Sequence, residues 1–420
     1  MARFLYCLVL YLAVPLVWLR LLWRSRKQPE YRQHVGERWG FYGPRPGQPA
    51  IWVHAVSVGE TRAAQPLVEA LLAAFPGHTL LLTGMTPTGR DAGRQVFGDR
   101  VRQAYLPYDY PGATRRFFRH FQPRQGILME TEIWPNLLAR AAAAGVPVAL
   151  ANARLSERSA RGYHRFAALT SDAFASLAAV AAQTEADARR LQRLGARQVE
   201  VCGNLKFDVT PSAEKLDLGR NWRAALGRRP VWLAASTREG EEALILDAFA
   251  RRPLPADTLL LLVPRHPQRF DEVAALVAGR GLNLVRRSQG LPDAQTDVWL
   301  GDSMGEMAAY FSLADLAYVG GSLLPLGGQN LIEAAACGCP VLVGPHTFNF
   351  TQATTDAIAA GAARRVADAT ELAAVSTTLL GNGEELAAMA QAARDFAVAH
   401  RGATERTLRL ILRLPDRAAR

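Results

Sequence analysis

The sequence predicts an α/β protein with two domains, each built on a parallel sheet that helices cover. Short apolar segments alternate with helical segments from about residue 50, a pattern typical of parallel sheets with helices on both faces. A polar stretch over residues 203–229 reads as a linker, and a second alternating series follows it. A length of 420 residues also suits two domains of ordinary size.

The expected strands of the first series are 51–55, 79–83, 126–130, 147–151, 178–183 and 199–202. Those of the second series are 231–235, 258–263, 298–301, 316–319 and 341–343. A helix is expected over 61–74. Sheets of this kind bind ligands at the carboxyl ends of their strands, so we expect the site in a cleft between the domains. We expect domains over 28–205 and 206–420, after an N-terminal segment over 1–27.

The N-terminal segment predicts a membrane anchor. Residues 4–23 are almost all apolar, and a basic stretch follows at 24–27. About 20 apolar residues span a bilayer once. The charge lies after the apolar core and no small-x-small site follows, unlike a cleaved signal peptide. The segment is therefore expected to form one anchor helix. By the positive-inside rule, the part of the chain that follows it is expected to lie in the cytoplasm. Pro15 and Arg20 weaken the span, so a buried hairpin or an interfacial helix is the alternative.

The net charge of the chain indicates which kinds of molecule it binds. The formal charge is +11, nearly all from Arg, which suits an acidic membrane surface, phosphate-bearing substrates or nucleic acid. No basic run with interleaved aromatic residues stands out in the globular part, so no nucleic acid is expected. The four cysteines lack framework spacing, which indicates a reducing compartment. We interpret Cys337 and Cys339 as packed small residues rather than half of a metal site.

The stretch 318–345 predicts a nucleotide site. The glycine pairs 320–321 and 327–328 let the backbone approach a ligand, and a helix that opens near Asn330 presents free N–H groups to a phosphate. Glu333, one turn inside that helix, is spaced to reach a ribose hydroxyl. A plain turn of a parallel sheet is the alternative, but two glycine pairs followed by these polar residues favour the nucleotide.

Three carboxylates follow strands of the first series. Glu60 lies at the start of a helix, where the helix dipole is expected to keep it ionised and fit to accept a proton. An ordinary helix N-terminal charge is an equal alternative. Glu130 and Glu132 end an apolar strand, and alternation places them on one face. Carboxylates at a buried strand end are unfavourable unless paired or functional, so we interpret both as functional.

Polar residues also follow the linker and the second series. Lys206, at the linker, either neutralises an anion or is a surface cation. Arg265 offers a planar guanidinium suited to phosphate, whereas His266 between two prolines is as consistent with a structural role. Asp302 either contacts a base or ribose or caps a helix.

Seven motifs occur in order along the chain. They are HAVSVGE (54–60), TPTG (86–89), METEIWPN (129–136), GNLK (203–206), PRHP (264–267), GEM (305–307) and GQNLIE (328–333). The last resembles the nucleotide signature of GT-B glycosyltransferases. Together with the apolar N-terminus, the seven motifs resemble the 3-deoxy-D-manno-octulosonic acid (Kdo) transferases of lipopolysaccharide assembly. The resemblance runs to about residue 400.

The resemblance implies a GT-B fold, in which two Rossmann-like domains face each other across a cleft. An N-terminal membrane-anchor helix would precede the two domains in the sequence. The last helical segment, 384–420, would pack back onto the first domain. The donor would be CMP-Kdo and the acceptor the glucosamine 6′-hydroxyl of a lipid A precursor. The enzyme would work on the cytoplasmic face of the bacterial inner membrane, with anionic lipids as further partners.

The resemblance also implies roles for single residues. Glu60 matches the catalytic base, acting with inversion at the anomeric carbon, and Glu130 and Lys206 match positions that stabilise the transition state. The matched CMP contacts are Pro264, Arg265, Gly305, Glu306, Met307, Asn330, Leu331, Ile332 and Glu333. The chain departs from the family at Arg238, where His is usual.

No metal or other cofactor is expected. No Asp-x-Asp motif ends a strand, and a helix N-terminus with Arg and Lys can stabilise a monophosphate leaving group. Two alternatives are a GT-B enzyme that uses a nucleotide diphosphate sugar and a nucleotide-sugar-binding protein without catalysis. The motifs around Glu60 and Lys206 count against the first, and the intact set Glu60, Glu130 and Lys206 counts against the second.

Overall fold

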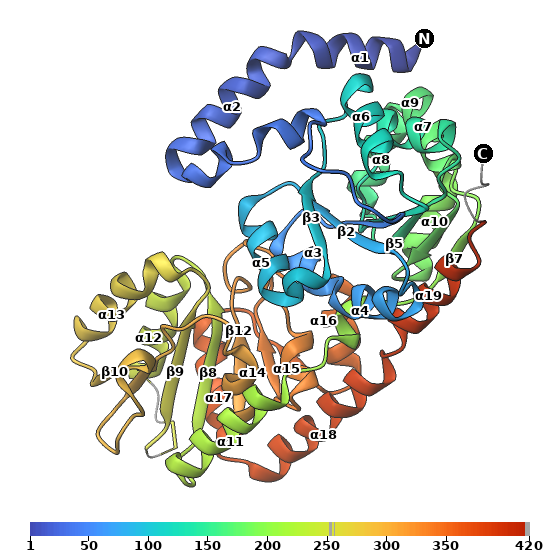
Figure 1. The fold of residues 1–420 in the computed structure, drawn as a ribbon. Helices are drawn as coiled ribbons and strands as arrows, with labels where there is room; N and C mark the ends of the chain where they lie inside the picture. The colour runs from blue at the N-terminus through green and yellow to red at the C-terminus, as the bar shows by residue number, and fades with distance from the viewer. Residues whose placement is uncertain (252–253, 256, 416–420) are drawn as a thin grey trace. The chain divides into compact units, whose positions relative to one another are not determined.

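The computed structural model describes residues 1–251, 254–255 and 257–415, which contain two parallel sheets (Figure 1). The chain divides into two compact units. Unit 1 comprises Met1–Val209 and Arg401–Arg420, and unit 2 comprises Thr210–His400. The predicted α/β fold with two parallel sheets is confirmed.

The sheet of unit 1 has seven parallel strands in the order β3-β2-β1-β4-β5-β6-β7. They are β1 (Ala50–His54), β2 (Thr79–Gly84), β3 (Arg102–Tyr105), β4 (Gln125–Met129), β5 (Val148–Ala153), β6 (Ala179–Ala182) and β7 (Val199–Val201). The order reverses beside β1, so β1 and β4 flank a topological switch point, where such sheets bind ligands. Of these strands only β3 was not predicted, because Arg102 and Gln103 interrupt its apolar pattern.

The helices of unit 1 are α1 (Ala2–Leu12), α2 (Val14–Lys27), α3 (Val58–Ala63), α4 (Gln65–Ala74), α5 (Pro87–Phe97), α6 (Pro111–Phe121), α7 (Pro135–Ala143), α8 (Glu157–Arg165), α9 (Ala167–Ala175), α10 (Glu185–Arg193) and α19 (Ala403–Leu412). The single helix predicted over 61–74 is thus two helices. Pro66 stands at the start of the second helix, where its missing N–H is tolerated.

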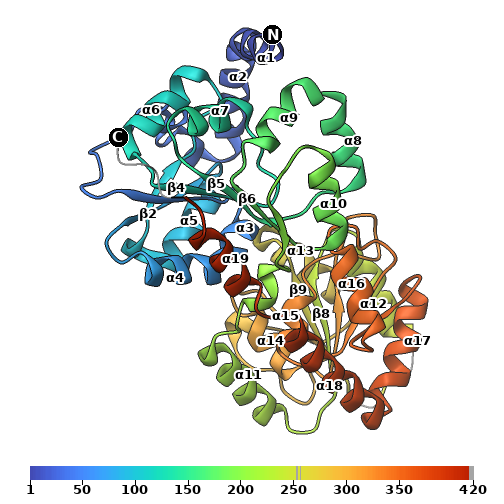
Figure 2. The ribbon, with the colours of Figure 1, turned by 90° about the vertical axis from the view of Figure 1, so that its right-hand side faces the viewer.

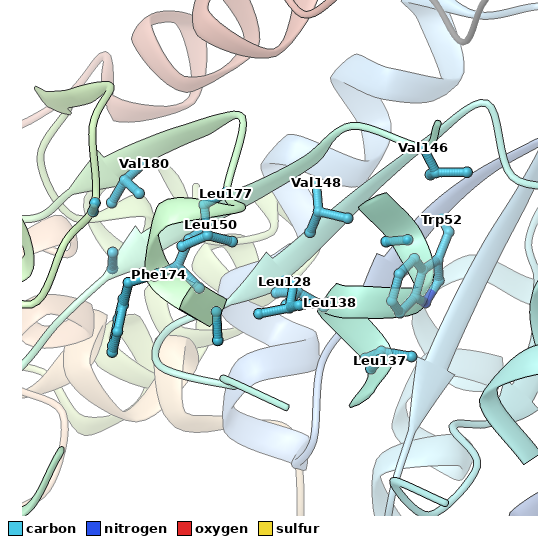
Figure 3. Close-up of a cluster of buried hydrophobic side chains, with 14 of the residues drawn as sticks. Trp52, Leu128, Leu137, Leu138, Val146, Val148, Leu150, Phe174, Leu177 and Val180 are labelled. Atoms are coloured by element: carbon cyan, nitrogen blue, oxygen red, sulfur yellow. The ribbon is translucent and has the colours of Figure 1, made fainter. Parts of the chain in front are cut away.

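Both faces of the unit 1 sheet are buried. Trp52 and Leu128 point to one face, where they pack with Leu137, Leu138 and Phe174 of the covering helices (Figure 3). Their neighbours along β1 and β4 point to the opposite face, where they pack against α4 and α19. This alternation follows from the two-residue period of a strand and fixes the strand ends that carry the polar residues.

The predicted linker is largely ordered as helix. Residues 205–208 form a 3-10 turn, η4 (Leu205–Asp208), and α11 (Ala213–Leu226) follows it, so within 203–229 only 203–204, 209–212 and 227–229 lack helical structure. The predicted helical segment 384–420 forms α18 in unit 2 and α19 in unit 1. Its last five residues, 416–420, lie outside the described residues.

The sheet of unit 2 has seven parallel strands in the order β10-β11-β9-β8-β12-β13-β14. They are β8 (Val231–Thr237), β9 (Leu259–Pro264), β10 (Leu284–Arg286), β11 (Val298–Leu300), β12 (Leu316–Val319), β13 (Val341–Val343) and β14 (Ala363–Arg365). The switch point lies between β8 and β12. The strands β10 and β14 were not predicted, because each is three residues long and ends in arginine.

The helices of unit 2 are α11, α12 (Glu241–Arg251), α13 (Phe270–Ala278), α14 (Met307–Leu313), α15 (Ile332–Ala336), α16 (Thr351–Ala359), α17 (Ala369–Leu380) and α18 (Gly383–Ala399). The helix that follows β8, α12, packs against α17, as Figure 2 shows. On the sheet, the apolar side chains of β8, β9 and β12 form a buried core with those helices.

The N-terminal run forms two helices where one was predicted. α1 and α2 meet at Ala13 with a bend of 50°, and Pro15 lies in the first turn of α2, a position that its missing N–H favours. Among the described residues, no helix alone has the length and apolar composition of a membrane span, and α1 and α2 reach them only as this bent pair. α1 docks on unit 1 through a hydrogen bond of 3.0 Å from the Tyr6 hydroxyl to Asp109.

Candidate active site

Glu60 lies at the switch point of unit 1. The chain leaves β1 at His54, and the Ser57 hydroxyl caps α3 by accepting a hydrogen bond from the Glu60 amide at 3.3 Å. The Glu60 carboxylate accepts hydrogen bonds from the Val56 amide at 2.9 Å and from the Ser57 hydroxyl at 3.2 Å. This reciprocal arrangement resembles a capping box, except that the main-chain donor is the residue before the N-cap, and it holds the carboxylate beside the end of β1.

The surroundings of Glu60 favour its protonated form. Burial raises its pKa to about 7, and the negative charges of Glu130 and Glu132 act in the same direction, against the hydrogen bonds from Val56 and Ser57. Burial therefore outweighs the helix dipole that was expected to keep Glu60 ionised. A carboxylate that binds a proton near neutral pH is suited to general base catalysis.

Glu130 follows β4, the other strand at this switch point. Its φ of +56° is uncommon for a residue other than glycine, and its amide donates to the Ala151 carbonyl at 2.9 Å. β4 ends at Met129, so strand alternation does not orient Glu130 and Glu132 as predicted. The turn nevertheless brings both carboxylates close enough to Glu60 to raise its pKa.

Two cations flank the Glu130 carboxylate. Lys206 Nζ lies 3.8 Å from Oε1, and Arg154 Nη2 lies 3.9 Å from Oε2. Lys206 thus pairs with a carboxylate of the protein itself, and its role towards the anion of a ligand stays a prediction. Arg154 was not predicted, because nothing in its local sequence sets it apart from other surface arginines. Glu132 instead accepts a hydrogen bond of 2.9 Å from the Trp134 indole, and burial raises its pKa.

Two further residues position Lys206. The amide of Leu205 donates to the side-chain oxygen of Asn152 at 3.0 Å. Asn152 is fully buried at the end of β5 with a φ of +53°. On the far side of η4, the Asp208 carboxylate accepts a hydrogen bond of 2.7 Å from the amide of Gly402, just before α19. Neither Asn152 nor Asp208 was singled out from the sequence, because their role depends on contacts with distant residues.

The predicted donor contacts belong to unit 2. Pro264 is buried as the last residue of β9, and Arg265 and His266 follow it as exposed residues. The pKa of His266 is lowered by partial burial and then by the charges of Arg238, Arg265 and Arg269. Arg269 is paired with Glu242 and Glu272. By contrast, Arg238 and Arg265 bring guanidinium groups to the carboxyl ends of β8 and β9, which suits an anionic ligand.

Residues 305–307 lie after β11 and open α14. The Glu306 carboxylate pairs with Arg287 at 3.2 Å, so part of its hydrogen-bonding capacity is used within unit 2. Asp302 was left open as a ligand contact or a helix cap. Its carboxylate accepts hydrogen bonds from the amide of Ser288 at 2.8 Å and from the hydroxyl of Ser288 at 2.6 Å, so it supports the loop after β10 and does not cap α14.

The last predicted contacts surround the start of α15. The Asn330 side chain accepts a hydrogen bond from the Ile332 amide at 3.2 Å and donates one to Glu333 at 3.1 Å. Glu333 therefore lies in the first turn of α15, held by Asn330 and half-buried. Leu331 and Ile332 are buried, so their main chains are the parts suited to a ligand contact.

The glycine pair 320–321 packs inside unit 2. The sequence had predicted that its backbone approaches a ligand. The amides of Gly321, Ser322 and Leu323 donate to the buried carboxylate of Glu241 at 2.6, 3.0 and 3.1 Å. Gly320 packs so closely on the end of β8 that a Cβ there would lie 2.6 Å from the Ser236 carbonyl oxygen. Glu241 was not recognised from the sequence, because glutamates in the first turn of a helix are common.

A family model and two similar proteins of known name all point to the same family. A family model described as 3-Deoxy-D-manno-octulosonic-acid transferase (kdotransferase) matches residues 33–209. The chain is 49% identical to the 3-deoxy-D-manno-octulosonic acid transferase of Bordetella pertussis, over 97% of this chain and 98% of the relative. It is 39% identical to the enzyme of the same name from Haemophilus influenzae, over 98% of each.

The fold is also found among solved structures. A glycosyltransferase from Rickettsia africae ESF-5 superposes with a TM-score of 0.59 over 88% of this chain and 100% of that chain, at 13% identity. The predicted GT-B type of two-sheet fold is thus shared with a solved glycosyltransferase, and at this identity the similarity concerns the fold alone.

Proposed function

Because this chain belongs to the 3-deoxy-D-manno-octulosonic acid (Kdo) transferase family, we propose that it transfers Kdo from CMP-Kdo to the glucosamine 6′-hydroxyl of a lipid A precursor. The observation that carries the proposal is the placement of Glu60 beside Glu130 at the switch point of unit 1, in a chain that matches two such transferases over nearly its whole length.

Glu60 is the general base in this proposal. Its carboxylate accepts the proton of the acceptor hydroxyl, and its pKa of about 7 suits that step at neutral pH. The hydroxyl oxygen forms a bond to the anomeric carbon of Kdo while the bond from that carbon to the CMP phosphate breaks. The oxygen attacks from the side opposite the leaving phosphate, so the configuration at the anomeric carbon inverts.

Lys206 and Glu130 stabilise the charges of the transition state. The sugar carboxylate and the departing phosphate are both negative, and the Lys206 ammonium, 3.8 Å from Glu130, offsets that charge. Glu130 and the turn anchored by Asn152 fix the ammonium before the reaction begins. Preorganised charges of this kind lower the barrier because no solvent has to reorient during the reaction.

Unit 2 binds the donor. Arg265, at the carboxyl end of β9, pairs with the phosphate of CMP. Glu333, held beside Asn330, accepts a hydrogen bond from a ribose hydroxyl. The other donor contacts are Pro264, Gly305, Glu306, Met307, Leu331 and Ile332. Arg and Lys together can meet the charge of a monophosphate, so the transfer needs no metal ion.

The N-terminal helices hold the enzyme on the cytoplasmic face of the bacterial inner membrane. α1 and α2 expose large apolar side chains, among them Phe4 at 72%, Leu12 at 72% and Trp23 at 58%. Arg24, Arg26 and Lys27 end α2. Exposed apolar residues next to basic ones bind the interface of a bilayer that contains anionic lipids.

The direct test is an assay of the purified full chain in detergent. The protein is incubated with a lipid A precursor and CMP-Kdo formed in the tube, and EDTA is added once the donor has formed. Mass spectrometry of the lipid is expected to show added Kdo with and without EDTA. An unmodified lipid, from folded protein that binds UDP and not CMP, would contradict the proposal and favour a nucleotide diphosphate sugar as donor.

A further inference from the structure

Glu241 joins two segments at the switch point of unit 2. It is the first residue of α12, directly after the turn that leaves β8, and its side chain is fully buried. An ionised carboxylate in such a position is unfavourable unless strong donors surround it. The donors around Glu241 come from the turn after β8, and from β12 and the loop that follows it on the other side of the switch point.

Five groups donate to this carboxylate. One oxygen accepts from the Tyr318 hydroxyl at 2.6 Å, and from the amides of Ser322 at 3.0 Å and Leu323 at 3.1 Å. The other accepts from the amides of Gly321 at 2.6 Å and Arg238 at 2.9 Å. Both oxygens are therefore engaged with N–H or O–H donors, and four of the five donors lie in the segment 318–323.

The same segment sets the entry to α15. The carbonyls of Gly320 and Gly321 accept hydrogen bonds from the amides of Gln329 at 3.0 Å and Gly328 at 2.7 Å. The next residue, Asn330, accepts a hydrogen bond from the Ile332 amide at the start of α15 and donates one to the Glu333 carboxylate. A continuous set of hydrogen bonds thus runs from Glu241 through the glycine-rich loop to the residues that we assign to the donor.

We propose that Glu241 is a positioning residue for the nucleotide-sugar donor. Its carboxylate fixes the conformation of the loop 320–329 and of the turn at Arg238. In that conformation Asn330 and Glu333 are positioned to bind the nucleotide. Glu241 itself does not touch the donor. The inference rests on the assignment of CMP-Kdo as donor, and its effect is on donor binding rather than on the transfer step.

The test compares two adjacent buried glutamates. Glu241→Gln keeps the size of the side chain, but whichever oxygen becomes NH2 then faces at least two donors, so at least two hydrogen bonds are lost. Glu242→Gln is the matched control, because Glu242 is equally buried on α12 but bonds to Thr237 and Arg269. Tyr318→Phe is a milder variant that removes one donor, should Glu241→Gln fail to fold.

Each full-chain protein is titrated with CMP by calorimetry, assayed for KM and kcat with CMP-Kdo, and followed by amide hydrogen exchange. We expect Glu241→Gln to raise the CMP Kd and the donor KM at least tenfold, to change kcat less than threefold, and to speed exchange over 321–323. We expect Tyr318→Phe to do the same to a smaller extent, and Glu242→Gln to leave Kd unchanged.

Equal CMP affinity of wild type, Glu241→Gln and Tyr318→Phe would overturn the inference and leave the proposed function intact. An equal loss of affinity in Glu241→Gln and Glu242→Gln would also overturn it, because the effect would then be a general loss of structure. Wild-type protein that does not bind CMP would contradict the donor assignment, and the inference would fall with it.

Discussion

Each sheet places a glutamate beside its switch point, and the two glutamates have different surroundings. Glu60 follows the first strand of unit 1, and Glu241 follows the first strand of unit 2. The Glu60 carboxylate accepts from one amide and one hydroxyl and has Glu130 and Glu132 nearby. The Glu241 carboxylate accepts five hydrogen bonds.

The difference shows that the same position in this fold suits a carboxyl group either to accept a proton or to fix a loop. Burial and neighbouring negative charge outweigh the two hydrogen bonds to Glu60 and raise its pKa, which suits it to accept a proton. Four main-chain amides and the Tyr318 hydroxyl instead fix the Glu241 carboxylate, around which a loop is organised. If unit 1 carries the catalysis and unit 2 binds the donor, substitutions in unit 1 should change the transfer rate and substitutions in unit 2 should change CMP affinity.

The largest effect is expected for Glu60→Gln. The amide keeps the size of the side chain but cannot accept the proton, so transfer should slow by about 10²–10⁴-fold. CMP affinity should not change, because the donor contacts lie in unit 2. Rates from product mass spectrometry and calorimetric CMP titration measure both, with Glu69→Gln as a surface control in the same unit. A variant that transfers Kdo at the wild-type rate would remove Glu60 from the mechanism.

Lys206→Met should have the next largest effect. It removes the ammonium beside Glu130 while keeping an unbranched side chain, and loss of one preorganised charge typically lowers kcat by roughly 10²-fold or more. The measurement is kcat at saturating CMP-Kdo, with Lys215→Met as the control. A change confined to KM would mean that Lys206 binds the ground state and does not stabilise the transition state.

The pH dependence of transfer should follow Glu60. Only the deprotonated carboxylate accepts a proton, so kcat/KM should fall about tenfold for each pH unit below 7 and level off above it. A glutamate with the ordinary pKa of 4.5 would keep its full rate well below neutral pH. The rate is measured from pH 5 to 8.5, with CMP affinity measured alongside. A flat profile down to pH 5.5 would contradict the raised pKa.

Glu333→Ala should have the smallest effect of the four. It removes one charge-assisted hydrogen bond to the ribose, so the CMP Kd should rise about tenfold while Glu60 and its proton transfer remain intact. Calorimetry with CMP measures the change, and Glu384→Ala, an exposed glutamate of unit 2, is the control. Unchanged affinity would remove Glu333 from the donor site.

Most of the fold was predictable because the strands of both sheets are buried on two faces. The uninterrupted apolar runs at 51–53 and 259–263 illustrate this. The failures have physical causes. The strands β10 and β14 are short and end in arginine, and Pro15 and Pro66 divide apolar runs that read as single helices.

The placement of Glu60 and Glu130 after two neighbouring strands could be predicted from their motifs, whereas the roles of Glu60, Glu130 and Lys206 stay predictions. The raised pKa of Glu60 could not be predicted, because it depends on burial and on two carboxylates 70 or more residues away in the chain. Asn152 and Glu241 were missed for the same reason, since their partners are distant in sequence.

One measurement tests the account most directly: the rate of Kdo transfer and the CMP Kd of the Glu60→Gln protein, set beside those of wild type. The account predicts that the variant binds CMP as wild type does and transfers Kdo at least a hundredfold more slowly. A variant that loses CMP binding, or one that transfers Kdo at the wild-type rate, would contradict the assignment of the chemistry to Glu60 in unit 1 and of the donor to unit 2.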